Sequence, residues 1–288
     1  MSINRQQVTK QDRVVAVMGP TGTGKSTFIE YATRQNGQTI GHGLQSCTED
    51  IRIVRVNHPH DGRPVALVDT PGFDDTYKSD NEILTMIANW LVKTYRGDVN
   101  LATIVYLHRI SDNRMAGSTL KNLQMFAALC GRKAMPNVII ATTMWKKVTE
   151  EEGERAEQML KRDFWKNMLA DGCRTERFKD SHDSAWQIID DAKKDQAPVL
   201  LPREIVDSHL RLNETQVGIV LNKELEKLIK DRKDAARRLR EQVQNQNNEL
   251  VVQELNELQE KINQTADQLR ELKIPFTRRV RLFFKGRG

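Results

Sequence analysis

Near its N-terminus the chain reads VVAVM at residues 14–18 and then GPTGTGKS at residues 19–26. A short continuous apolar run is typical of a buried parallel strand, and the glycine-rich run satisfies the pattern GxxxxGK[ST] of a phosphate-binding loop. In such a loop backbone N–H groups surround the phosphates, Lys25 reaches the β- and γ-phosphates, and the Ser26 hydroxyl ligates Mg²⁺. Residues 27–34 can form the helix that must follow. The predicted nucleotide-binding residues are Thr21, Gly22, Thr23, Gly24, Lys25, Ser26 and Thr27.

A second motif, Asp69-Thr70-Pro71-Gly72, stands at the end of another predicted strand. In P-loop nucleotidases an acid at this place supports Mg²⁺, and the glycine N–H senses the γ-phosphate. The glycine-rich segment 41–50 lies between the two motifs, where a switch loop would cover the phosphates. Thr48 in this segment is the candidate that completes the Mg²⁺ shell; the alternative is that it only caps the next strand. The predicted metal ligands are Ser26, Thr48 and Asp69, and Gly72 is a predicted switch contact.

Outward from these motifs, strand and helix patterns alternate along the chain. Helices are predicted at residues 81–95 and 118–130, and strands at 51–56, 65–69, 101–107 and 138–142, the first two joined as a hairpin. A charged helical segment, a weaker strand near residue 178 and a further helix near residue 184 follow. This order predicts an α/β fold in which helices cover both faces of the sheet.

The C-terminal third has a different pattern, because strand signals stop after residue 202. Leucines recur at steps of three and four over 221–239 and 251–272, and the two registers do not join. One alternative is a single helix whose heptad register shifts between the two blocks and which forms a coiled coil with a partner. The other is two helices that pack against each other as a hairpin. The predicted parts are a flexible N-terminus at 1–12, a nucleotide-binding domain at 13–200, a helical extension at 201–273 and a tail at 274–288.

The net charge of +6 is concentrated in that tail, whose five basic residues and no acid leave the rest of the chain at +1. The tail also contains several aromatic residues, a composition that suits an anionic membrane surface. The alternative is a terminal segment docked on the domain. Nucleic acid is a less favoured partner because no other basic patch accompanies the tail.

The cysteines and the apolar runs bear on the compartment. Cys47, Cys130 and Cys173 are widely spaced, which argues against a disulfide scaffold and favours a reducing compartment. The polar start lacks the apolar core of a signal peptide, and no apolar run reaches the ~18 residues of a membrane span. We therefore expect a cytoplasmic protein, peripheral at a membrane if the tail binds one.

Three segments carry a family resemblance: GPTGTGKST at 19–27, SCTEDI at 46–51 and DTPGFDD at 69–75. Together they resemble the septin, GIMAP-type and chloroplast-import (Toc) branch of the Ras-like GTPases, and still more a group of septin-like G-domain proteins of fungi. The resemblance covers residues 13–192. It implies a Ras-like fold, binding of GTP or GDP with Mg²⁺, and pairing of two copies across their nucleotide faces.

The resemblance departs from the family at the base. Members carry [NT]KxD after the fifth strand, and its Asp binds guanine, whereas residues 141–147 here read ATTMWKK without an aspartate. The candidate replacements are Trp145, stacking on the purine, and Thr143, reading it; the alternative is that Met144 and Trp145 only pack. Ser184-Ala185 is the candidate for the family's Ser-Ala signature near the base. Because the carboxylate is missing, ATP stays open beside GTP.

A second departure concerns hydrolysis. Ras-like enzymes orient the attacking water with a Gln directly after the DxxG element, and that neighbour here is Phe73. Hydrolysis is therefore predicted to be slow, or to depend on His42 or on a residue of a second molecule. The main alternative is a pseudo-GTPase scaffold that uses its helices and tail for assembly.

Overall fold

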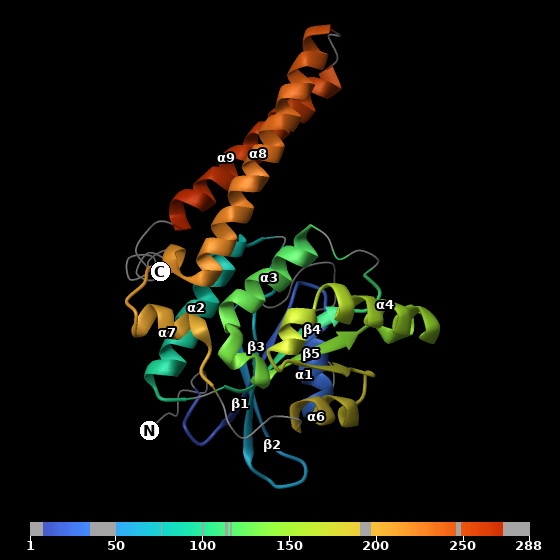
Figure 1. The fold of residues 1–288 in the computed structure, drawn as a ribbon, viewed down its shortest axis with the longest axis vertical. Helices are drawn as coiled ribbons and strands as arrows, with labels where there is room; N and C mark the ends of the chain where they lie inside the picture. The colour runs from blue at the N-terminus through green and yellow to red at the C-terminus, as the bar shows by residue number, and fades with distance from the viewer. Residues whose placement is uncertain are drawn as a thin grey trace. The chain divides into compact units, whose positions relative to one another are not determined.

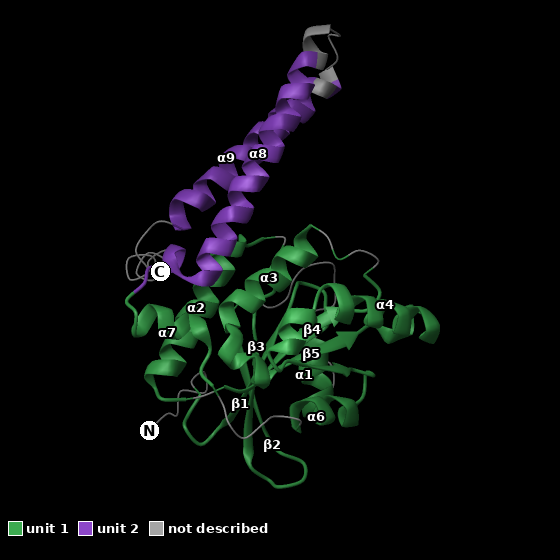
Figure 2. Ribbon diagram, viewed as in Figure 1, with its two compact units in different colours: residues 1–209 green, residues 210–288 purple. Residues whose placement is uncertain are grey.

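The computed structural model describes residues 8–34, 50–75, 77–99, 101–112, 115, 117–190, 197–245 and 249–272. The chain divides into two compact units, residues 1–209 and residues 210–288 (Figure 2). The first unit contains the phosphate-binding loop, and the second contains the leucine-spaced helices.

One sheet forms the centre of the first unit. Its strands, within the described residues, are β1 (Arg13–Met18), β2 (Arg52–Asn57), β3 (Pro64–Asp69), β4 (Leu101–Arg109), β5 (Val138–Thr143) and β6 (Arg174–Arg177). Their order in space is β2-β3-β1-β4-β5-β6 (Figure 1). Neighbouring strands are parallel except for the predicted β2–β3 hairpin, which is antiparallel. The strand order reverses at β1, so the crevice beyond its carboxyl end is where a ligand is expected.

Helices cover both faces of this sheet, because successive residues of a strand point to opposite sides. On one face the core packs against α1 (Lys25–Thr33) and α6 (His182–Asp190). On the other, Tyr106 of β4 lies against Phe126 of α3 (Ser118–Cys130), with ring centroids 4.4 Å apart. The helices α2 (Asp80–Arg96) and α3 both pack against α7 (Leu200–Val206). The predicted fold class is confirmed.

Two details of the first unit differ from the sequence prediction. The charged segment after β5 is divided between α4 (Glu150–Asp163) and the short α5 (Lys166–Ala170). A capping box fixes the start of α4, because Thr149 and Glu152 satisfy each other's backbone N–H groups. The unit also extends to residue 209 rather than ending at 200, since α7 packs against α2 and α3. Cys130 and Cys173 are buried free thiols.

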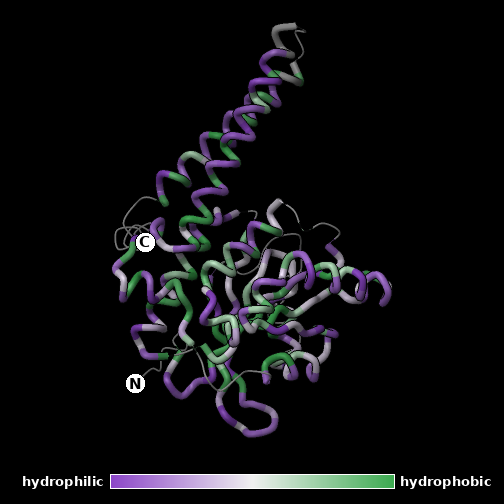
Figure 3. The backbone as a smooth tube through the Cα atoms, viewed as in Figure 1, coloured by the Kyte–Doolittle hydropathy of each residue, from purple (hydrophilic) through white to green (hydrophobic). Residues whose placement is uncertain are grey.

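The second unit contains the turn η3 (Leu212–Glu214) and two helices, α8 (Gln216–Asn245) and α9 (Glu249–Leu272), that pack along each other as a hairpin (Figure 1). Hydrophobic and hydrophilic residues alternate along both helices (Figure 3). Two polar residues that interrupt the leucine spacing meet in the hairpin. Arg232 Nη1 donates to the Lys261 carbonyl at 2.7 Å and also to the Thr265 hydroxyl. These bonds fix how the two helices are aligned.

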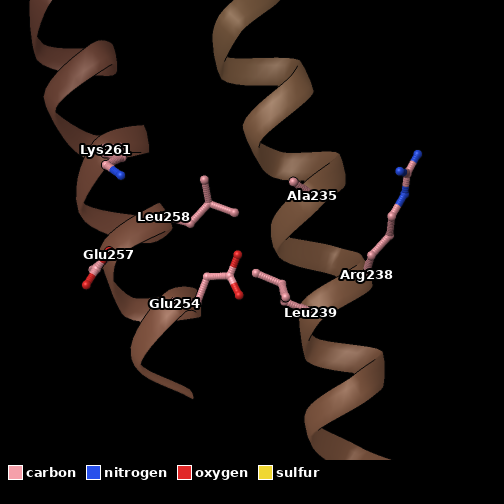
Figure 4. Close-up of a pocket in the computed structure, with 7 residues that line it drawn as sticks. All are labelled: Ala235, Arg238, Leu239, Glu254, Glu257, Leu258 and Lys261. Atoms are coloured by element: carbon pink, nitrogen blue, oxygen red, sulfur yellow. The ribbon is translucent and has the colours of Figure 1, made fainter. Parts of the chain in front are cut away.

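Farther along the hairpin, the side chains facing the space between α8 and α9 are partly charged. Figure 4 shows Glu254 and Leu258 of α9 pointing toward α8, near Leu239. Leu228, one of the leucines in the repeating pattern, is 39% exposed. Within the described part of the chain, no helix combines the length and the apolar character that crossing a membrane requires.

Candidate nucleotide-binding site

The glycine-rich loop joins β1 to α1, as predicted. Gly22 and Gly24 have φ values of +78° and +91°, a region that other residues rarely adopt. Lys25 is the first residue of α1, and its Nζ donates to the carbonyls of Gly19 at 3.0 Å and Pro20 at 2.9 Å. The side chain is buried, and this burial lowers the pKa of Lys25 to about 8. A buried ammonium group at a helix N-terminus favours an anion such as phosphate.

Ser26 of α1 and Asp69 of β3 lie together at the edge of the sheet where the parallel strands β1 and β3 end. Asp69 is the last residue of β3 and pairs in register with Val17 of β1. The Ser26 hydroxyl donates to Asp69 Oδ2 at 2.9 Å, and Asp69 is buried. Neighbouring oxygens in an octahedral Mg²⁺ shell are about 3 Å apart, because Mg–O distances are about 2.0–2.1 Å. The two side chains therefore fit Mg²⁺.

The donor set also suits this ion. Within the described ranges, no cluster of three or more His, Cys, Asp or Glu side chains could hold a metal. Mg²⁺ is usually bound through one or two protein carboxylates, with water and substrate phosphates supplying the other oxygens. A hydroxyl and one carboxylate beside a phosphate-binding loop match that pattern.

Residues 70–73 lie directly against the loop. The Thr70 hydroxyl donates to the Val17 carbonyl at 2.9 Å, and the Thr21 N–H donates to the Phe73 carbonyl at 3.0 Å. A Cβ atom at Gly72 would lie 2.6 Å from Thr21 N and 2.7 Å from Lys25 Nζ, so only glycine fits. Gly72 thus lies where a switch contact was predicted. Phe73 is buried and apolar, and it offers no group that could orient water.

The structure places Thr143, the candidate for reading the base, at the end of β5. Thr143 is buried, and its hydroxyl donates to the Thr23 carbonyl at 3.0 Å and lies 3.4 Å from the His108 carbonyl. The hydroxyl is therefore occupied within the protein. Its role is to hold the phosphate-binding loop against the sheet.

Trp145, the candidate stacking platform for the purine, makes packing contacts within the protein. Its Nε1 donates to Thr142 Oγ1 at 3.0 Å, and the Arg177 guanidinium lies over the ring, 4.4 Å from the centroid. A Cβ atom at Gly153 of α4 would come within 2.5 Å of the ring, so the helix packs closely on it. The alternative weighed for Trp145, that it packs, is the arrangement observed.

Ser184 and Ala185, the candidates for the Ser-Ala signature near the base, lie in α6. Ala185 is buried in the core, and Ser184 Oγ accepts from the Lys179 N–H at 3.1 Å and donates to the Ser181 carbonyl at 3.0 Å. Both residues belong to α6 because the chain turns into that helix at residue 182, two positions earlier than the Ser-Ala dipeptide.

Two residues near the loop were missed in the sequence. Lys146 lies in the stretch after β5 where the aspartate was expected, and its Nζ pairs with Asp180 Oδ2 at 3.2 Å. Arg109, the last residue of β4, lies beside Gly22: a Cβ atom there would be 3.4 Å from Arg109 Nη1. The position of Arg109 at the carboxyl end of a central strand is a signal that could have identified it. His42, Thr48 and the basic tail 274–288 lie outside the described residues.

Comparisons with known proteins agree with this geometry. Residues 14–143, just under half of the chain, match the family model described as 50S ribosome-binding GTPase. A 70-residue stretch is 31% identical to mitochondrial translation initiation factor IF-2 of Saccharomyces cerevisiae, covering 24% of this chain and 10% of that protein's length. The chain thus spans only a small part of this curated relative.

Two solved structures share the fold. Toc33 from Arabidopsis thaliana in complex with GDP and Mg²⁺ is 14% identical, with a TM-score of 0.50, over 66% of this chain and 87% of that one. A structure of the chloroplast translocon components atToc33 and psToc159, described as showing that dimerization is important for their GTPase activity, is 12% identical. Its TM-score is also 0.50, over 66% of this chain and 86% of that one. The sheet order and the loop show a P-loop GTPase fold, and residues 14–143 match a GTPase family model.

Proposed function

We propose that the protein binds a guanine nucleotide together with Mg²⁺ and hydrolyses GTP slowly. The observation that carries this proposal is the convergence of Lys25, Ser26 and Asp69 beyond the carboxyl ends of β1 and β3. These three side chains supply the ammonium, hydroxyl and carboxylate groups that a nucleotide triphosphate and its metal require.

Each residue has a distinct role in the proposed reaction. Backbone N–H groups of residues 22–25 bind the phosphates, and Lys25 exchanges its two carbonyl partners for phosphate oxygens. Ser26 and Asp69 hold Mg²⁺, which when bound neutralises charge on the β- and γ-phosphates. Gly72 offers its N–H to the γ-phosphate. Hydrolysis is slow because Phe73 stands where related enzymes place a water-orienting Gln.

The same geometry supports a role as a switch. Thr21 bonds to Phe73 across the entrance of the loop, so a γ-phosphate bound beside Gly72 would compete with this contact. Its loss on GTP binding would free the segment after Gly72, and hydrolysis would restore it. Two copies of this chain pairing across their nucleotide faces would extend the site, and dimerization is described as important for the GTPase activity of atToc33 and psToc159.

An ATP-preferring enzyme is the second candidate, and a specific observation favours it. Lys146 lies in the stretch where the carboxylate that distinguishes guanine was expected, and both Thr143 and Trp145 are committed to contacts within the protein. A site without a partner for the guanine edge discriminates weakly between the two purines.

The test is to measure the affinity of the full chain for fluorescent GDP and ADP, and phosphate release from GTP and ATP. We expect Lys25→Ala to abolish binding of both nucleotides and Ser26→Ala to remove the Mg²⁺ dependence of binding. Lys161→Ala, which removes a lysine of α4 paired with Glu157, serves as the matched control and should bind normally. Unchanged affinity in Lys25→Ala would refute nucleotide binding at this loop, and binding without phosphate release would establish the pseudo-GTPase.

A further inference from the structure

Arg109 contacts the phosphate-binding loop from the neighbouring strand. It is the last residue of β4, and its Cα pairs in register with Thr143 of β5. Its Nη1 would lie 3.4 Å from a Cβ atom placed on Gly22, which is ordinary van der Waals contact. The side chain is 37% exposed, so its guanidinium stands at the rim of the site with access to a bound ligand.

Arg109 forms an ion pair with Asp112. Asp112 Oδ1 lies 2.9 Å from Arg109 Nε, and the Asp112 N–H donates to the Arg109 carbonyl at 3.2 Å. The backbone at this turn is also held to β5, because the Ile110 N–H donates to the Thr143 carbonyl at 3.0 Å. The ion pair with Asp112 is on the Nε side of the guanidinium, and Nη1 is the guanidinium atom that lies close to Gly22. Within the described residues, no second carboxylate forms an ion pair with Arg109.

The site needs such a group. Hydrolysis of a nucleoside triphosphate moves negative charge onto the leaving diphosphate, and Phe73 can neither bind that charge nor orient water. Lys25 Nζ is bonded to the carbonyls of Gly19 and Pro20. An arginine guanidinium presents planar N–H donors that match two phosphate oxygens at once, and it stays protonated at any working pH.

We propose that Arg109 is a catalytic arginine that acts within its own chain on the phosphates bound over Gly22. This inference rests on the proposed GTP hydrolysis. Water attacks the γ-phosphorus, and the bond between that phosphorus and the β–γ bridging oxygen breaks, leaving its electron pair on GDP. The hydrogens of the water stay with the departing dihydrogen phosphate, which releases a proton to the solvent. The Nη groups of Arg109 bind the oxygens that gain charge in this step.

The test is single-turnover hydrolysis of GTP by Arg109→Ala, with GDP affinity measured on the same preparation. We expect the hydrolysis rate to fall about 30-fold or more while GDP affinity changes less than about threefold, because the contact strengthens in the transition state. Arg109→Lys keeps the positive charge but loses the planar set of N–H donors, so it should recover only part of the hydrolysis rate. Arg132→Ala, which removes an exposed arginine paired with Asp171, is the matched control and should hydrolyse GTP normally.

A second measurement separates action within one chain from action across a dimer. If Arg109 serves its own loop, the ratio of wild-type to Arg109→Ala rates stays the same from low to high protein concentration. A ratio that approaches one on dilution would overturn the proposal in favour of an arginine donated by a second copy. Equal rates at every concentration would overturn it outright, as would a wild-type protein that binds GTP without hydrolysing it. A wild-type protein that binds neither GTP nor ATP would instead refute the proposed function itself.

Discussion

Two neighbouring threonines of β5 allow a matched test of how the phosphate-binding loop is held. Thr143→Val removes the hydroxyl that donates to the Thr23 carbonyl at 3.0 Å, and Thr142→Val removes one that donates to the Glu176 carbonyl at 3.2 Å. Both side chains are buried and valine has nearly the same shape, so each change leaves carbonyl groups short of a partner. We expect each variant to lose about 1–3 kcal/mol in the free energy of unfolding.

The two variants should differ in nucleotide binding. Thr143→Val releases the backbone at Thr23, in the middle of the loop, and we expect a loss of affinity of about tenfold, or about 1.4 kcal/mol. Thr142→Val alters only the contact with β6 and Trp145, and should bind as wild type does. Urea unfolding gives the stability of each variant, and titration with fluorescent GDP and ADP gives the affinities.

The ratio of GDP to ADP affinity decides which role Thr143 has. A residue that holds the loop affects the phosphates, which the two nucleotides share, so both affinities fall together. If Thr143→Val weakened GDP alone, the hydroxyl would be reading the base and the structural assignment would be wrong. Equal affinities in Thr143→Val, Thr142→Val and wild type would refute the idea that Thr143 positions the loop.

Other parts of the structure make further predictions. Gly72→Ala places a Cβ atom 2.6 Å from Thr21 N, so it should force the switch segment off the loop, lower stability by about 1–3 kcal/mol and weaken nucleotide binding in thermal-shift assays. The pKa of Lys25 is about 8 without nucleotide, and bound phosphate favours the ammonium form. Affinity should therefore be highest below pH 8 and fall by up to about tenfold per pH unit above it, and a flat profile from pH 7 to 9 would contradict this role. Arg232→Ala removes the donor to the Lys261 carbonyl and Thr265, so thermal loss of helicity in the hairpin should begin at a lower temperature; an unchanged melting curve would show that these bonds do not hold it.

The predicted site residues that the structure brings together are those encoded by local spacing. The loop and the strand before it are contiguous, and Asp69 ends a strand whose parallel partner is β1. Because adjacent parallel strands end at the same edge, the sequence was enough to bring Asp69 to Ser26. The same reasoning extends to Arg109, because its position at the end of β4 indicates that it lies at this edge of the sheet.

The sequence could not show the contacts of residues whose environment comes from distant parts of the chain. Trp145 is available or occupied depending on Arg177 of β6 and Gly153 of α4, and the sequence around Trp145 contains neither contact. The position of Ser184 depends on the path of the chain between β6 and α6. Asp180, in this connection, has a φ of +47°. A non-glycine residue in the left-handed region has no clear sequence signal. The first unit extends beyond residue 200 for a similar reason, since α7 packs on α2, more than a hundred residues earlier in the chain, and on α3.

Arg109 and Thr143 contact the phosphate-binding loop together, and their two contacts depend on each other. They are paired in register across β4 and β5, and the Ile110 N–H bonds to the Thr143 carbonyl. Arg109 meets the loop at Gly22, and Thr143 holds it at the next residue, Thr23. When Thr143 no longer fixes the loop, Arg109 loses its alignment with the phosphates as well. The effects of Thr143→Val and Arg109→Ala on the hydrolysis rate should therefore be less than additive in the double variant. Additive effects would mean that the strand edge does not align the arginine, and that Asp112 alone orients it.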